Sequence, residues 1–170
     1  AQEIATIIAR QFVEVMGIPE CSISLLDTEE GTLPVLVDIF VEEGEETIRE
    51  EELREVYRLA DYPAPTRVIE TLQPLVIQAS DPDADPAELA YMRKHEVETL
   101  AIIPLAVKGQ AIGIIELETW DQERHYTQEQ LNLAMTLANQ AAVALENARL
   151  FEEAQQRLQE LAVLNELSQA

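Results

Sequence analysis

The amino-acid sequence predicts an α+β protein built around an antiparallel sheet. Three observations predict this class: two apolar segments flank Lys108-Gly109-Gln110, the strands are grouped apart from the helices, and the final segment contains no glycine or proline. Two strands joined by such a short turn pair antiparallel. Strands that group in hairpins, with helices between the groups, are typical of an α+β domain.

The first part of the chain predicts a helix and then a hairpin. Apolar side chains at helical spacing indicate the helix, which Gly17 and Pro19 end, and period-two alternation indicates the strands. Pro34 stands near the start of the second strand, where a missing N–H is tolerated. The predicted elements are a helix over 1–16, a strand over 21–26, a turn over 27–31 and a strand over 33–41.

A glutamate-rich run over residues 42–55 follows this hairpin. We expect a solvated loop that leads into a surface helix over 50–60, with Leu53, Val56, Tyr57 and Ala60 facing inward. A metal site is the alternative interpretation, but the run matches no ligand spacing such as that of a calcium loop.

The middle of the chain predicts short elements followed by a long hairpin. Asp81, Asp83 and Asp85 have the opening spacing of a calcium loop, yet Pro86 and Met92 occupy its glycine and closing glutamate positions. Helix capping explains the segment better, with Asp85 as N-cap and Pro86 in the first turn. The expected elements are a helix over 66–72, a strand over 75–78, a helix from 86 to about 95, strands over 97–107 and 111–118, and a polar connection over 120–126.

The last segment, from Thr127 to Ala170, predicts one long helix. Thr127 and Gln130 have the spacing of a capping box. At about 1.5 Å per residue the helix is about 66 Å long, which exceeds the diameter of a compact body of this size. We therefore assign residues 1–150 to one domain and residues 151–170 to a connector. The stripe expected to lie on the domain consists of Leu131, Ala134, Leu137, Ala138, Ala141 and Leu145.

The connector carries apolar residues at alternating spacings of three and four, as in a coiled-coil heptad. This pattern predicts a homodimer through the terminal helices. The alternative is a single helix that lies on a neighbouring domain. The predicted interface residues are Leu145, Phe151, Ala154, Leu158, Leu161 and Asn165, with Ser168 continuing the pattern.

Composition limits the classes of function. The hydrophobic content of 47% excludes disorder, and the longest apolar run, 100–107, is too short to span a membrane. A net charge of −22 argues against nucleic acid and anionic membranes as partners. One cysteine, and no signal peptide, favour a cytoplasmic protein. Because both ends fall in helical sequence, we expect a piece of a longer protein.

Residues 104–117 resemble the central hairpin of GAF domains. Residues 68–77 resemble the segment of that family that precedes its next strand, and Leu137 to Ala154 is similar to its closing helix. The resemblance implies a sheet of five or six strands with helices on its faces. It also implies a sensory module of a bacterial signalling protein, with a small-molecule pocket near residues 61–95 and an output domain such as a histidine kinase, a cyclase, or a further GAF or PAS domain.

The resemblance does not identify a ligand. Bilin-binding members of the family attach the pigment to a cysteine in the second half of the domain, whereas Cys21 lies on the first strand, so covalent bilin is disfavoured. Haem is disfavoured because its one plausible axial ligand, His95, stands at a helix end, where a histidine is more often a surface or capping residue. No nucleophile arrangement is present, so we expect a protein that is not an enzyme. The candidate ligand-binding residues are Tyr62, Arg67, Tyr91, His95 and Thr99. Two functions stay open: a ligand-binding sensor, and a ligand-free dimerising spacer that relays motion.

Overall fold

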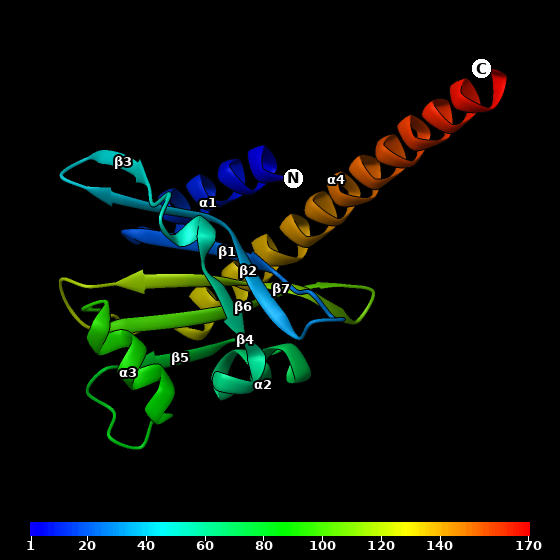
Figure 1. Ribbon diagram of the computed structural model, residues 1–170. Coiled ribbons are helices and arrows are strands. Elements are labelled where there is room, and N and C mark those ends of the chain that lie inside the picture. The colour runs from blue at the N-terminus through cyan, green and yellow to red at the C-terminus, as the bar shows by residue number, and fades with distance from the viewer.

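A seven-stranded antiparallel sheet forms the centre of the computed structural model, which describes residues 1–170 (Figure 1). Six strands follow the order β3-β2-β1-β7-β6-β5, and a short seventh strand, β4, pairs separately with β2. The strands are β1 (Glu20–Leu25), β2 (Thr32–Glu42), β3 (Glu45–Ile48), β4 (Val56–Arg58), β5 (Leu75–Gln78), β6 (Thr99–Val107) and β7 (Gln110–Thr119). The predicted α+β class and antiparallel sheet are confirmed.

Helices cover both faces of the sheet. The helices α1 and α4 lie on one face, while α2 and α3 lie on the other (Figure 1). Their bounds are α1 (Gln2–Met16), α2 (Pro63–Thr71), α3 (Pro86–Lys94) and α4 (Gln128–Gln169), with short 3-10 turns η1 (Glu52–Arg54) and η2 (Leu59–Asp61). The protein therefore has three layers and a separate core on each side of the sheet.

The alternation of side chains along β6 divides residues between these two cores. Ala101 and Ile103 are buried against α1 and α4, whereas Leu100 and Ile102 are buried against α2 and α3. Successive side chains of a strand point to opposite faces, so a strand covered on both sides must be apolar throughout. This explains why the β6 segment is a continuous apolar run.

Three local predictions are confirmed. Lys108 and Gly109 both have positive φ, 52° and 76°, as a two-residue hairpin turn requires. The Asp85 carboxylate accepts hydrogen bonds from the backbone N–H groups of Ala87 and Glu88 at the start of α3. Thr127 and its partner in the first turn of α4 form the predicted capping box.

The helix predicted over residues 50–60 is wrong. The segment forms η1, β4 and η2, and Val56, which was expected to face inward, is 55% exposed. The exposed edge of β2 decides the outcome, since β4 pairs with it between Thr32 and Pro34. Tertiary pairing thus overrides the helical preference of the glutamates.

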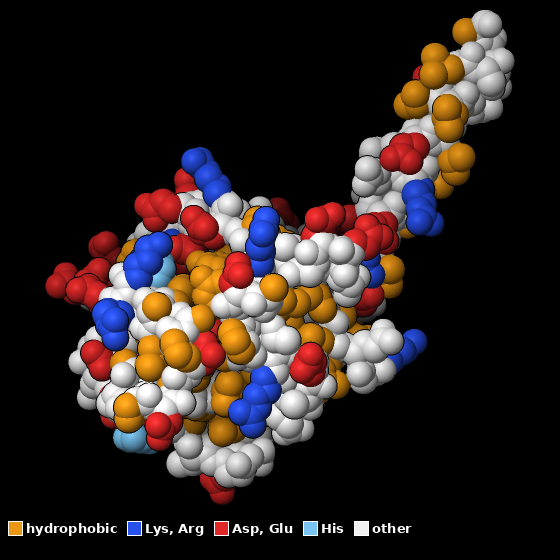
Figure 2. All heavy atoms as spheres, turned by 60° about the horizontal axis from the view of Figure 1, so that its bottom comes forward, with side chains coloured by type: hydrophobic (Ala, Val, Ile, Leu, Met, Phe, Trp, Pro, Cys, Tyr) orange, Lys and Arg blue, Asp and Glu red, His pale blue; other side chains and the backbone are white.

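Helix α4 has two different environments along its 42 residues. Its last buried residue is Leu145, and every residue from Arg149 onward is exposed. The distal part projects from the body and carries hydrophobic side chains in the open (Figure 2). No helix of the protein combines the length and apolar character that crossing a membrane requires.

Gly113 marks a close approach between β7 and β1. A Cβ built at this position would lie 2.2 Å from the backbone oxygen of Ser24. We predict that Gly113→Ala lowers the free energy of unfolding by about 1–3 kcal/mol, because the central strands must separate to admit a methyl group. Urea denaturation measures the change. Gly109→Asn is the control, with a smaller expected effect, because its Cβ meets open space and asparagine tolerates positive φ.

Candidate functional site

The candidate site lies between the sheet and the layer of α2 and α3. On strand β7, the side chains of Ile115 and Leu117 point toward α1 and α4. Glu116 and Glu118 alternate with them and therefore point toward α2 and α3. On the neighbouring strand β1, Ser22 pairs with Glu116 and Glu20 pairs with Glu118. The sheet therefore presents a carboxylate-rich surface to α3.

A small cavity of about 20 Å³ lies above this surface. This volume has room for about one water molecule. An open groove of about 520 Å³ adjoins the cavity and shares Tyr57, Arg58, Tyr62 and Tyr91 with it. The cavity is lined by Leu33, Tyr57, Arg58, Leu59, Tyr62, Pro65, Glu88, Tyr91 and Glu116.

Three tyrosines from three different elements form the shared wall. The ring of Tyr57, from β4, meets Tyr62 edge-on at 5.5 Å and Tyr91 at 6.1 Å between centroids. Tyr62 is the residue before the first turn of α2, and Tyr91 lies on α3. His95, one turn further along α3, stacks on Tyr91 at 4.4 Å.

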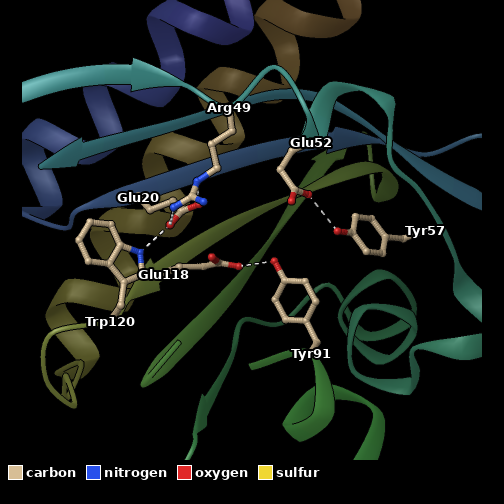
Figure 3. A network of polar contacts seen from close by, with 7 residues as sticks. All are labelled: Glu20, Arg49, Glu52, Tyr57, Tyr91, Glu118 and Trp120. Atoms are coloured by element: carbon tan, nitrogen blue, oxygen red, sulfur yellow. Dashed lines mark hydrogen bonds and ion pairs between the residues drawn. The ribbon is translucent and has the colours of Figure 1, made fainter. Parts of the chain in front are cut away.

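Carboxylates hold two of these phenols in place. Tyr91 Oη donates to Glu118 Oε1 at 2.6 Å, and Tyr57 Oη donates to Glu52 Oε2 at 3.1 Å (Figure 3). A buried phenol needs a hydrogen-bond partner, and a carboxylate is a strong acceptor. The ring positions are therefore set by the acidic groups around them.

The inner end of the site is a network centred on Glu20. Its Oε2 accepts a hydrogen bond from Trp120 Nε1 at 2.6 Å, and its Oε1 lies 3.1 Å from Arg49 Nε (Figure 3). The guanidinium of Arg49 also lies over the ring of Phe40 at 4.3 Å. Asp38 is buried beside Glu20, and its Oδ1 has no hydrogen-bond partner.

One arginine does not neutralise this group of acids. Burial raises the pKa of Asp38 to about 9, of Glu116 to about 8 and of Glu88 to about 7. Burial also raises the pKa of Glu118 well above its ordinary value, and the charge of Glu20 adds to that shift. The acids do not form a metal centre, since no group of three or more metal-ligating side chains is suitably arranged.

The structure brings three of the five predicted ligand-binding residues together. Tyr62, Tyr91 and His95 line the groove. Arg67 lies elsewhere, in a separate depression with Asp81 and Asp83. Thr99 is fully buried, where its Oγ1 donates to Gln78 Oε1 at 2.5 Å and accepts from the backbone N–H of Arg124.

The predicted interface residues also separate into two groups. Leu145 is fully buried in the core between the sheet and α4, so its assignment to an exposed dimer interface is wrong. Its small neighbours on α4 let the helix lie close on the sheet, and Leu145 fills the end of that contact. The exposed residues of the predicted stripe are Phe151, Ala154, Leu158, Leu161 and Asn165.

Sequence reasoning missed the carboxylates and Tyr57 as site residues. The alternation of Glu116 and Glu118 with apolar residues was the available signal, but the segment was interpreted only as an apolar strand. Tyr57 was missed because it was predicted to lie on a helix over residues 50–60 that the structure does not form. Cys21, on β1, is fully buried on the α1–α4 side of the sheet and is therefore remote from the groove.

The sheet order, the two helical layers and the pocket on the α2–α3 face define an α+β domain of the GAF type. Residues 1–146 match the family described as GAF domain, and the chain belongs to this family. The expectation drawn from the three sequence segments is thereby confirmed.

Three proteins that resemble the chain are distant from it in sequence. It is 28% identical over 81 residues to hybrid signal transduction histidine kinase G of Dictyostelium discoideum, covering 48% of this chain but only 2% of that protein. The GAF domain/HD domain protein of Geobacter sulfurreducens has a TM-score of 0.71 at 12% identity, covering 88% of this chain and 94% of that one. A domain described as part of a two-component sensor histidine kinase of Sinorhizobium meliloti 1021 has a TM-score of 0.66 at 16% identity, covering 92% and 97%.

The raised pKa values predict stability that falls as pH rises. Burial raises the pKa of Glu116 to about 8 in the folded protein, against about 4.3 in the unfolded chain, so the unfolded chain loses this proton first as pH rises. The contribution of each such group to the free energy of unfolding is complete below pH 4. It falls by up to about 1.4 kcal/mol per pH unit as pH rises toward 8. We expect Glu116→Gln to unfold at a higher temperature than the native protein at pH 8.5, with a smaller difference at pH 5.

Differential scanning calorimetry at both pH values measures this effect. Glu14→Gln is the matched control, because it removes one carboxylate from the exposed face of α1. Equal stabilisation by the two variants would mean that total charge, and not burial at Glu116, sets the pH dependence.

Proposed function

We propose that this GAF domain is a sensory module that binds a small molecule in the groove between β4, α2 and α3. The wall of Tyr57, Tyr62 and Tyr91, which the groove shares with the cavity above the carboxylates, supports the proposal most directly. The groove's volume of about 520 Å³ is compatible with a small-molecule ligand. The histidine kinase names of two relatives are consistent with a sensory role. We further propose that the domain is not an enzyme, since the one thiol is buried and burial raises its pKa.

A mechanical path supports a relay from this groove to α4. Strand β7 contributes Glu116 to the pocket and, one residue away on each side, Ile115 and Leu117 to the core beneath α4. Because a packed strand moves as a unit, a ligand that displaces β7 changes the packing of α4. The continuous helix then carries the displacement to an output domain.

The projecting part of α4 supports relay through a homodimer. Phe151, Leu158 and Leu161 are each more than 60% exposed and follow heptad spacing. An exposed apolar stripe on a helix without a partner is stabilised by pairing with a second copy. In the proposed assembly, ligand binding shifts the register or separation of two α4 helices.

A second candidate function is a ligand-free spacer. The inner cavity of about 20 Å³ favours it, because the tyrosines already fill the space beneath the groove. In that case the domain holds two copies of the protein together as a dimer and transmits motion from a neighbouring domain. Ligand binding distinguishes the two functions.

Blocking the groove tests the sensory function. We expect a ligand from a panel of nucleotides and metabolites to raise the unfolding free energy by about 2.7 kcal/mol at 100 times its Kd. Ala90→Trp fills the groove from an exposed position on α3 and should abolish that shift. Gln11→Trp, on the exposed face of α1, is the control. Thermal-shift responses that are equal in the two variants would place binding outside the groove.

A charge in the connector tests the dimer. Leu161→Glu places a carboxylate on the apolar stripe, so we expect dissociation to a folded monomer, with at least a tenfold rise in the dimer dissociation constant. Val163→Glu adds the same charge at a similarly exposed residue on the opposite side of the helix and should stay dimeric. Sedimentation velocity at micromolar concentration measures both. A Leu161→Glu dimer of native strength would contradict the proposed interface.

A further inference from the structure

We propose that the site accepts a small organic amine, with its protonated primary ammonium group in the tyrosine cavity against Glu88 and Glu116. The inference rests on the proposed sensory function and adds the chemical class of the ligand. It is carried by an unpartnered buried carboxylate oxygen, a wall of aromatic rings and the excess of acidic groups around them.

The strongest indication is Glu88. This residue of α3 is only 2% exposed and lines the cavity, yet its Oε1 has no hydrogen-bond partner. A buried acceptor without a partner destabilises the fold, and more so when it is charged. A ligand that supplies an N–H donor at this point removes that cost.

The aromatic wall favours a cationic donor. The Tyr57 ring stands nearly perpendicular to those of Tyr62 and Tyr91, at 80° and 81°, so ring faces and edges surround one small space. Aromatic faces attract cations, and clusters of such rings recognise ammonium groups. Because the Tyr57 and Tyr91 hydroxyls donate hydrogen bonds to Glu52 and Glu118, their rings become richer in electrons.

The charges around the cavity also favour a cation. Glu88 and Glu116 line it, and the groups that act on them electrostatically are Asp85, Glu20 and Glu52. The cations nearby are Arg58 and Lys94, which line the cavity or groove but are themselves exposed to solvent. Solvated charges at a rim are screened, whereas Glu88 is buried and Glu116 is half-buried, so their charges are screened less.

The two volumes indicate which part of such a molecule would lie in the cavity and which part in the groove. The cavity of about 20 Å³ admits a group the size of one water molecule, such as an ammonium head, and the groove of about 520 Å³ takes the rest. The primary amine fits better than a quaternary one, because only N–H groups can donate to Glu88 Oε1. The body of the ligand would lie beside Tyr62 and His95.

Burial raises the pKa of Glu88 to about 7 and that of Glu116 to about 8. A cation beside them favours the ionised carboxylates, so its binding releases protons at neutral pH. Ammonium affinity should therefore increase between pH 6 and pH 8. This dependence would distinguish binding at Glu88 and Glu116 from binding at glutamates on the exposed surface.

The test is a nuclear magnetic resonance titration of the isotopically labelled protein with propylammonium. Propan-1-ol, propionate and trimethylpropylammonium are the comparison probes, each at up to about 50 mM. We expect saturable shifts of the backbone amides of Tyr57, Tyr62, Glu88 and Tyr91 with propylammonium. The quaternary analogue should bind at least several-fold more weakly, and the alcohol and propionate should leave these amides unchanged.

Two variants complete the test. Glu88→Gln keeps the shape of the side chain and should weaken propylammonium binding about tenfold or more. Glu14→Gln, on the far side of the sheet, should leave it unchanged. Retained affinity in Glu88→Gln would overturn the assignment of the ammonium group to this carboxylate.

The probes also separate failure of this inference from failure of the proposed function. If propan-1-ol or propionate shifts the lining amides and propylammonium does not, the site binds small molecules but not amines, and this inference is wrong. If no probe shifts them but a ligand of the panel still gives a thermal shift that Ala90→Trp abolishes, this inference is wrong and the sensory function stands. If neither experiment detects binding, both fail.

Discussion

The structure depends on the alternation of side chains along β7. Ile115 and Leu117 pack under α1 and α4, while Glu116 and Glu118 face α2 and α3. The strand occupies the middle of the sheet, between β1 and β6, and Gly113 lets its backbone lie against β1. A single strand thus belongs both to the core that holds the long helix and to the surface that holds the candidate site. A displacement of β7 therefore changes the packing on both faces of the sheet.

Burying the carboxylates on the α2–α3 face of the sheet destabilises the fold, and this cost indicates that these carboxylates have a role. Apolar residues in place of Asp38, Glu88 and Glu118 would bury more easily, because carboxylates lose hydration on burial and must bind protons or find partners. Arg49 and Trp120 satisfy Glu20, but Asp38 and Glu88 each keep an oxygen without a partner. Buried polar groups that are left unsatisfied are concentrated where a protein binds something or changes state.

Much of the local structure follows from short-range chemistry. The Asp85 cap, the capping box at Thr127 and the turn at Lys108 and Gly109 each depend on a few neighbouring residues, so the sequence predicts them well. The predicted site was less complete. Tyr62, Tyr91 and His95 meet at the groove, but Arg67 and Thr99 do not, because segments that are near in sequence turn to different sides of α2 and the sheet.

The sequence alone determined the α+β class, the long final helix and membership of the GAF family, since these depend on periodicity, capping and motifs that lie within short segments. Tertiary contacts were needed to show that residues 56–58 form a strand, that Leu145 is a core residue and that Tyr57 and Glu88 line one cavity above the sheet. The physical reason is that an open sheet edge, a closed core and a cavity are each built from residues far apart in the chain. Their pairing energies outweigh the preferences that any one segment has by itself.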